Sequence, residues 1–273
     1  MRNLRGKKVL ITGGASGIGL CTALEFARAG SEIVLTDLNA EALKDAEAQV
    51  SALGTAVYTQ TVDVTNREQV EGLARWVMNG VGGLDILINN AGIGHHGELA
   101  ETSLETWQKL IAVNLLGPLY HVYAFLPHFK ERKAGHIVNI SSGQAFYRLP
   151  TWGAYASVKA ALAVFSEVLH FEVRKYGIKV TTVYPYMVNT PFYKDVKGET
   201  LGARLSMKLL PLYSMSPEKV ARIIFKAVRR DAKVEMVSLW NDLGLYGRMV
   251  PFASDIMAMT GNFLLAKPPE KSQ

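Results

Sequence analysis

Tyr155 and Lys159 are the two residues whose types and spacing point most directly to chemistry. They lie four positions apart in a segment with helical periodicity, so both side chains should project from one face of one helix. A phenol with a reference pKa of about 10 is a poor proton-transfer group, but a nearby ammonium stabilises its phenolate. The pair therefore predicts general acid–base catalysis, although a packed tyrosine beside an exposed lysine would have the same spacing.

Ser142 follows a β-branched strand pattern and stands 13 residues before Tyr155 (155 − 142 = 13). In open parallel sheets, ligands bind beyond the carboxyl ends of the strands, where this hydroxyl would meet Tyr155. Strand side chains alternate between faces, so only one of Ser141 and Ser142 is expected to face the site. We assign Ser142 as the hydrogen-bond donor to a substrate oxygen.

A glycine-rich segment, TGGASGIG at residues 12–19, follows the first predicted strand and opens into a predicted helix. Glycines allow a tight turn and a close approach to a pyrophosphate, whose charge is favoured by the helix N-terminus. The spacing differs from the usual GxGxxG fingerprint, and alone it would suit a structural turn equally well.

Asp37 ends the second predicted strand, 18 residues after Gly19 (37 − 19 = 18). A carboxylate there can accept hydrogen bonds from both adenosine ribose hydroxyls and repels a 2′-phosphate. Leu38 follows it, and Ser16 occupies the loop position where a cation would help hold a phosphate. NAD is therefore favoured over NADP, although an aspartate in a turn before the next helix would look the same.

Short β-branched runs that alternate with longer helical patterns are expected to position these residues. The predicted helices include three starts with capping signals, at Thr65 with Glu68, Thr102 with Glu105, and Ser216 before Pro217. The predicted strands are Lys8–Thr12, Glu32–Thr36, Ala56–Val62, Ile86–Asn89, His136–Ile140, Lys179–Val183 and Val234–Val237. The predicted helices are Ile18–Ala29, Ala40–Leu53, Arg67–Asn79, Leu104–Lys130, Ala154–Lys175 and Glu218–Arg230.

Six motifs in this order make the chain resemble the short-chain dehydrogenase/reductase family over about residues 7–190. They are TGGASGIG, Asp63-Val64, Asn89-Asn90-Ala91-Gly92, Asn114, Ser142 and Tyr155-Ala-Ser-Val-Lys159. The resemblance implies an α/β fold, a Rossmann-like, doubly wound, seven-stranded parallel sheet of order 3-2-1-4-5-6-7 with helices on both faces. We expect residues 1–273 to form a single domain, with a substrate loop at 186–215 and a C-terminal extension at 238–273.

The resemblance also implies roles for individual residues. Tyr155 would be the general acid/base, Ser142 the substrate-oxygen donor and Lys159 a ribose ligand that lowers the tyrosine pKa, while Asn114 would hold a water linking Lys159 to solvent. Asp63 and Val64 would contact adenine, residues 90–92 would pass beside the adenosine ribose, and Val188 and Thr190 would hold the nicotinamide carboxamide. The expected cofactor-binding residues are Gly13, Ser16, Gly17, Ile18, Gly19, Asp37, Asp63, Val64, Asn90, Ala91, Gly92, Tyr155, Lys159, Pro185, Val188 and Thr190.

One residue departs from the family pattern, because Tyr186 follows Pro185 where the family usually has glycine. Its side chain would either narrow the pocket or point to solvent. The loop beyond it and residues 146–152 are rich in aromatic and aliphatic side chains, which would suit a lipophilic substrate but equally a core or a subunit interface. His95-His96 lacks nearby carboxylate or cysteine partners, so no metal site is expected.

Composition bounds the remaining alternatives. The chain has 273 residues, of which 49% are hydrophobic, and its net charge of +6 is spread along the sequence, so nucleic-acid binding is not indicated. The single cysteine cannot form an internal disulfide, the N-terminus lacks a signal-peptide core, and no apolar run approaches about 18 residues, so a cytoplasmic location is expected. Arg222, Lys226, Arg229 and Lys233 form a basic helix face that could rest on a membrane, but a solvated face is favoured.

The leading functional hypothesis is an NAD(H)-dependent oxidoreductase for a small, lipophilic alcohol or ketone. The alternatives are an NADPH-dependent 3-oxoacyl or carbonyl reductase, which Asp37 disfavours, and an inactive nucleotide-binding scaffold, which the complete set of catalytic residues disfavours. By family resemblance we expect a homodimer or homotetramer, assembled through the helices that carry Asn114 and Tyr155.

Overall fold

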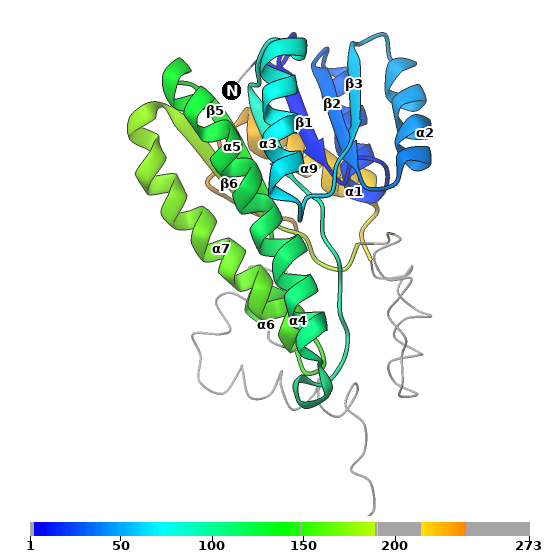
Figure 1. Cartoon of the computed structure of the whole chain (residues 1–273), viewed down its shortest axis with the longest axis vertical. Helices are drawn as coiled ribbons and strands as arrows, with labels where there is room; N and C mark the ends of the chain where they lie inside the picture. The colour runs from blue at the N-terminus through cyan, green and yellow to red at the C-terminus, as the bar shows by residue number, and fades with distance from the viewer. Residues whose placement is uncertain (1–2, 148, 189, 191–213, 239–273) are drawn as a thin grey trace, which may run out of the picture.

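A seven-stranded parallel sheet forms the centre of the computed structural model, which describes residues 3–147, 149–188, 190 and 214–238. The strand order is β3-β2-β1-β4-β5-β6-β7, which confirms the predicted order (Figure 1). The order reverses between β1 and β4, and such a switch point opens a crevice at the carboxyl ends of the strands. The strands are β1 (Lys8–Thr12), β2 (Glu32–Asp37), β3 (Val57–Thr61), β4 (Ile86–Asn89), β5 (Gly135–Ile140), β6 (Ile178–Tyr184) and β7 (Val234–Met236).

Helices cover both faces of the sheet (Figure 1). Val9 and Ile11 of β1 pack into the cluster that includes α1 (Gly17–Arg28), α2 (Ala40–Ser51) and α9 (Pro217–Arg229). Leu10 packs on the opposite face with α3 (Arg67–Trp76), α5 (Gly117–Arg132) and α7 (Gly153–Val173). Successive residues of a strand thus point to opposite faces, and because both faces are covered the strand is apolar throughout.

The helix predicted at Leu104–Lys130 is interrupted, which corrects the sequence-based expectation. It consists of α4 (Leu104–Ile111), a π-helical turn η3 (Ala112–Leu116) and α5. By length and composition alone, Leu104–Arg132 could cross a membrane, although polar residues interrupt its apolar runs. In the structure, α5 packs against α3, and α4 and η3 pack against α7, as helices of a globular core do.

Two predicted helix caps were wrong by one residue. Asn66 caps α3 by accepting from Gln69 N, and Ser103 caps α4 by accepting from Thr106 N. The threonine hydroxyls are engaged elsewhere, since Thr65 donates to Asp63 Oδ1 at 2.7 Å and Thr102 donates to Glu98 O at 2.8 Å. The predicted cap of α9 is confirmed, with Ser216 accepting from Lys219 N ahead of Pro217.

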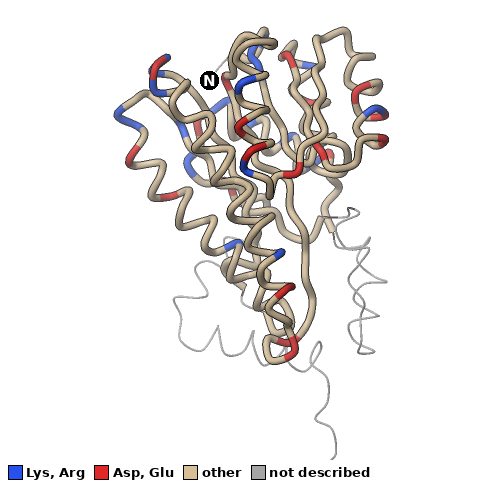
Figure 2. The backbone as a smooth tube through the Cα atoms, viewed as in Figure 1, with Lys and Arg blue, Asp and Glu red and all other residues tan. Residues whose placement is uncertain are grey.

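The short elements are α6 (Gln144–Tyr147), the π-helical turn η1 (Val77–Val81) and the 3-10 turns η2 (Leu99–Glu101) and η4 (Arg174–Tyr176). Positive and negative side chains are interspersed over the described backbone (Figure 2). Most of the predicted substrate loop and all but the first residue of the predicted C-terminal extension lie outside the described residues.

Candidate active site

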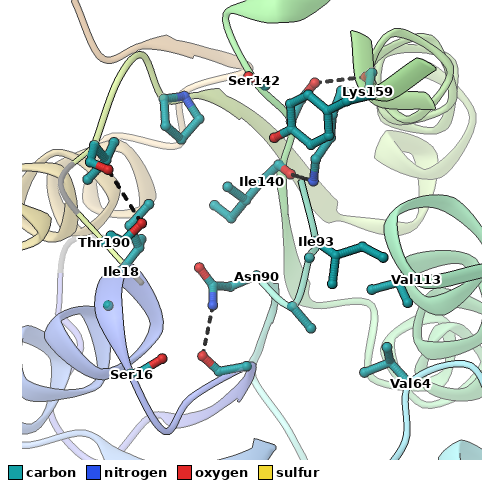
Figure 3. Close-up of a pocket in the computed structure, with 18 of the residues that line it drawn as sticks. Ser16, Ile18, Val64, Asn90, Ile93, Val113, Ile140, Ser142, Lys159 and Thr190 are labelled. Atoms are coloured by element: carbon teal, nitrogen blue, oxygen red, sulfur yellow. Dashed lines mark hydrogen bonds between the residues drawn. The ribbon is translucent and has the colours of Figure 1, made fainter. Parts of the chain in front are cut away.

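A pocket of about 500 Å³ lies at the switch point of the sheet (Figure 3). It draws its lining from the glycine-rich loop, the ends of β2 and β5, the loops after β3, β4 and β6, and the start of α7. The predicted site residues that line it are Gly13, Ser16, Gly17, Ile18, Asp37, Asp63, Val64, Asn90, Ala91, Gly92, Ser142, Tyr155, Lys159, Pro185, Val188 and Thr190. Gly19 and Asn114 are not part of the lining.

The glycine-rich loop forms a cradle with no room for a side chain at Gly13 or Gly19. Gly13 has φ +62°, and a Cβ there would lie 2.9 Å from Ala91 Cα. A Cβ at Gly19 would lie 2.1 Å from Gly13 O, so Gly19 makes room for the loop behind the pocket. Ser16 begins α1 without a side-chain cap, which leaves the first N–H groups of this helix to an anionic ligand. The loop therefore fits a dinucleotide pyrophosphate.

Asn90 joins this loop to β4. Its Nδ2 donates to Thr12 O and Gly13 O, both at 3.0 Å, and Thr12 Oγ1 accepts from the backbone N–H groups of Asn90 and Ala91 at 3.0 Å each. The Asn90 side-chain amide thus donates to the backbone of the glycine-rich loop and holds this loop against the end of β4.

Asp37 occupies the other end of the pocket from the reactive side chains and also supports the cradle. Its Oδ2 accepts from Ala15 N at 3.1 Å and its Oδ1 accepts from Asn39 N at 3.1 Å. The residue that caps α2 is Asn39, so the turn-aspartate alternative accounts for only part of the Asp37 contacts. Asp63 similarly accepts from Thr65 N and Thr65 Oγ1, which fixes the loop after β3.

Lys159 is a buried cation at the opposite end of the pocket. Its Nζ donates to Ile140 O at 3.0 Å and lies 5.8 Å from the centre of the Tyr155 ring (Figure 3). Only 4% of the residue is exposed, and this burial lowers the pKa of Lys159 to about 8. The α-helical spacing thus brings Lys159 and Tyr155 together, as the sequence predicts.

Asn114 lies behind this pair, in the π-helical turn η3. Its Oδ1 accepts from Ile93 N at 3.2 Å, and its Nδ2 donates to Ile93 O at 3.0 Å and to Leu110 O at 3.2 Å. A Cβ at Gly92 would lie 2.8 Å from Asn114 Oδ1 and 3.4 Å from Lys159 Nζ. Asn114 therefore fixes the loop after β4 against the helix, and its role in a water link stays a prediction.

The two serines after β5 are used differently. Ser141 donates its hydroxyl to Lys159 O at 2.8 Å, whereas Ser142 Oγ accepts from Gln144 N at 3.2 Å. Because this acceptor bond leaves the Ser142 proton available, Ser142 is the serine that can donate to a substrate oxygen. Tyr155 lines the pocket from the first turns of α7.

Tyr186 is among the residues that line the pocket. Its ring packs against Tyr147 with centroids 5.1 Å apart and planes inclined at 42°. The left-handed backbone conformation falls on the next residue, Met187, at φ +42°. Tyr186 thus needs no glycine-like conformation.

Several lining residues escaped the sequence analysis as site residues. Ile93 and Val113 adjoin predicted residues, and Ile140 and Gln144 each lie two residues from Ser142. Adjacency to a motif is the only signal that could have found them. In the described part of the chain, no group of three or more His, Cys, Asp or Glu side chains could hold a metal ion.

Residues 7–200 match the family described as short chain dehydrogenase. The chain belongs to this short-chain dehydrogenase family. Relatives in this family are oxidoreductases that act on CH–OH groups with a nicotinamide cofactor.

Two curated relatives illustrate the similarity of this short-chain dehydrogenase to known proteins. Estradiol 17-beta-dehydrogenase 11 of Homo sapiens is 36% identical over 236 residues, which cover 85% of this chain and 75% of that protein. The probable oxidoreductase EphD of Mycobacterium tuberculosis is 37% identical over 257 residues, which cover 90% of this chain and 43% of that protein. The chain thus spans less than half the length of the EphD relatives.

Solved structures share the fold of this short-chain dehydrogenase. A short-chain dehydrogenase/reductase from Burkholderia phymatum in complex with NAD matches with a TM-score of 0.85 at 25% identity, over 99% of this chain and 100% of that one. L-sorbose reductase from Gluconobacter frateurii, complexed with NADPH and L-sorbose, matches with a TM-score of 0.78 at 28% identity, over 86% of this chain and 96% of that one.

Proposed function

We propose that this short-chain dehydrogenase interconverts a lipophilic alcohol and the corresponding ketone or aldehyde with NAD(H), using Tyr155 as the proton-transfer group. The observation that carries the proposal is one pocket lined both by Ser142, Tyr155 and Lys159 and by the glycine cradle, which has no room for a side chain at Gly13. Apolar walls from Trp152, Tyr186 and Met187, and the resemblance to a relative named for estradiol, support a lipophilic substrate.

In the oxidation direction, Ser142 donates a hydrogen bond to the substrate oxygen and Tyr155 removes the hydroxyl proton. Tyr155 acts here as the phenolate and becomes a neutral phenol when it takes this proton. Lys159 stabilises the phenolate before the transfer, because its buried ammonium lies 5.8 Å from the ring centre. Lys159 Nζ carries three protons, of which one binds Ile140 O, so the others can reach a ribose hydroxyl. A bound nicotinamide would supply the hydride acceptor for the substrate carbon.

The preference for NAD rests on Asp37. The described lining residues from the glycine-rich loop and the end of β2 include this carboxylate and no Lys or Arg. A 2′-phosphate beside Asp37 would meet like charge without a compensating cation. Titration of protein fluorescence should therefore give a lower Kd for NADH than for NADPH. The reverse order would favour an NADPH-dependent carbonyl reductase.

Turnover by Tyr155→Phe tests the proposal most directly. We expect kcat/KM for an alcohol to fall by about 10²- to 10⁴-fold, while the Kd for NADH changes less than about twofold, because the substitution removes only the proton-transfer group. Tyr58→Phe, on the distant strand β3, is the matched control and should keep full activity. Turnover by Tyr155→Phe near the wild-type rate would refute the mechanism.

We also propose that the chain forms a homodimer or homotetramer through the outer faces of α5 and α7. Tyr123 on α5 and Val164, Val168 and Phe171 on α7 are between 50% and 66% exposed. Large apolar side chains gathered on two neighbouring helices are typical of a protein interface. Light scattering should give a mass of at least twice 30.0 kDa, and Val168→Glu should reduce it to the monomer.

A further inference from the structure

Gln144 stands out in the pocket because its side-chain oxygen has no hydrogen-bond partner. The residue is 8% exposed, its Oε1 is fully buried, and no hydrogen bond reaches this atom. A buried polar atom that is left unpaired destabilises a fold, so native structures rarely keep one without a reason. Partners supplied by a ligand are one such reason.

The position of this unpaired atom is informative. Other buried side-chain atoms without a partner occur in the described part of the chain, at Thr22, Thr36, Gln60, Asn89, His121, His136 and Ser214. None of those residues lines the pocket, whereas Gln144 does. The unsatisfied amide oxygen of Gln144 is therefore the one that belongs to a residue at the candidate active site.

Gln144 is also fixed close to the predicted reaction centre. Its backbone N–H donates to Ser142 Oγ at 3.2 Å, so the side chain starts beside the hydroxyl that would hold the reacting oxygen. The backbone around it is held by two further bonds, from Gly143 N to Pro185 O at 2.8 Å and from Ala145 N to Ser142 O at 3.0 Å. The Gln144 side chain thus leaves from a rigid turn.

Several other polar groups that line the described part of the pocket already have roles. The Ser141 hydroxyl is bonded to Lys159 O, Thr190 Oγ1 donates to Val188 O at 3.4 Å, and Ser142, Tyr155 and Lys159 serve the reacting oxygen and the ribose in the proposed mechanism. The neighbouring walls are aromatic or aliphatic. A carboxamide here can accept a hydrogen bond through Oε1 and donate through Nε2, which matches an alcohol or a carbonyl oxygen.

We propose that Gln144 is a substrate-specificity residue, whose side-chain amide binds a second oxygen on the carbon next to the reacting carbon. The substrate class is then a diol or hydroxyketone with an otherwise apolar body. This inference rests on the proposed oxidoreductase function and names the substrate of the same site.

The test compares two substrates that differ by one hydroxyl, trans-cyclohexane-1,2-diol and cyclohexanol, with NAD. For the wild-type enzyme we expect kcat/KM to be about tenfold higher for the diol, as one hydrogen bond provides. Gln144→Met, which keeps the length but removes the amide, should bring this ratio close to one by raising KM for the diol. Gln49→Met, at an exposed position of α2, is the matched control and should keep the wild-type ratio.

A second measurement does not depend on turnover. Because the Gln144 amide oxygen has no partner within the fold, the Tm of Gln144→Met without ligand should equal or exceed that of the wild type. A Tm several degrees lower would show that the amide is bonded within the protein and would overturn the inference.

The kinetic outcomes separate this inference from the proposed function. Turnover of both alcohols with equal kcat/KM, or a ratio unchanged in Gln144→Met, would overturn the role of Gln144 and leave the oxidoreductase function intact. Absence of turnover with every alcohol and ketone in a broad panel would overturn the proposed function, and this inference with it.

Discussion

Both ends of the pocket contain residues in the left-handed backbone conformation, but the residue types differ between the two ends. At the cofactor end, the left-handed residues are Gly13 at φ +62° and Gly17 at φ +53°. At the substrate end, they are Thr151 at φ +68° and Met187 at φ +42°. Glycine adopts this conformation at no steric cost, whereas a residue with a side chain loses about 1–2 kcal/mol. The local sequence thus favours the left-handed conformations at the cofactor end, whereas those at the substrate end need support from tertiary contacts.

The contacts that support Thr151 are visible in the structure. His96 Nε2 lies 2.9 Å from Thr151 Oγ1, and Gly97 N donates to Thr151 O at 2.7 Å. The next residue, Trp152, packs edge-on against His96 and Tyr155 with centroid distances of 5.4 and 5.9 Å. The loop after β4 therefore holds the start of α7, which carries Tyr155, in a conformation that its own sequence disfavours.

The largest effect on the free energy of unfolding should come from Lys159, because burial of its charged form destabilises the substrate end. Its pKa is about 8 in the folded protein and 10.5 in the reference state. Between these values the unfolded chain binds more protons, so raising the pH stabilises the fold. The cost is complete below pH 8 and absent above 10.5. The free energy of unfolding should therefore rise by about 3 kcal/mol across this interval.

The measurement uses urea unfolding at several pH values, with Tyr155→Phe as the background so that the neighbouring phenol does not titrate. The difference between this variant and the double variant Tyr155→Phe/Lys159→Met isolates Lys159. A difference that stays constant from pH 8 to 10.5 would show that Lys159 is solvated in the folded protein.

At the cofactor end, the next largest effect is expected from Gly13→Ala. A Cβ would lie 2.9 Å from Ala91 Cα, so the loop or the strand must move, and overpacking of this kind costs about 1–3 kcal/mol. We expect the Kd for NADH to rise by about 10- to 100-fold, as fluorescence titration measures. Gly54→Ala is the matched control, because Gly54 has φ +76° but no atom within 4 Å of its Cβ position. Equal losses of NADH affinity in both variants would contradict the close-approach explanation.

This contrast explains how much the sequence could predict. The cradle and the Ser142, Tyr155 and Lys159 set were predictable, because glycines and fixed spacings encode them locally, whereas the strand order followed from the family resemblance. The π-helical turn at Asn114 was not, since nothing in a helical pattern signals a side chain that bonds Leu110 O and Ile93 O. The left-handed Thr151 and Met187 were equally hidden, because threonine and methionine do not mark such positions. Gln144 carries no motif, and only its burial beside Ser142 identifies it.

His96→Ala tests whether the loop after β4 positions the substrate end. Loss of the contact to Thr151 and of the edge packing on Trp152 should lower kcat/KM by about tenfold, which corresponds to one hydrogen bond and one aromatic contact. The Kd for NADH should change less than about twofold, because the cradle does not touch His96. His95→Ala, which removes a contact to Thr102 outside the pocket lining, should retain activity. A parallel loss of NADH affinity in His96→Ala would contradict a division between the two ends.

The smallest effect is expected from replacing Met187 by glycine. This substitution gives a left-handed position of the substrate end the residue type that the cofactor end has at Gly13 and Gly17. Met187→Gly should remove a left-handed strain of about 1–2 kcal/mol and add the entropy cost of glycine, about 0.5–1 kcal/mol. A net gain of about 0.5–1 kcal/mol is expected in urea unfolding, and Lys133→Gly, at φ +51° after α5 and remote from the pocket, should gain as much. The two variants should differ in kcat/KM alone, since Met187 lines the pocket and Lys133 does not. Met187→Gly could instead lower the free energy of unfolding while Lys133→Gly raises it. That result would mean that packing of the Met187 side chain stabilises the substrate end by more than the left-handed backbone strain destabilises it.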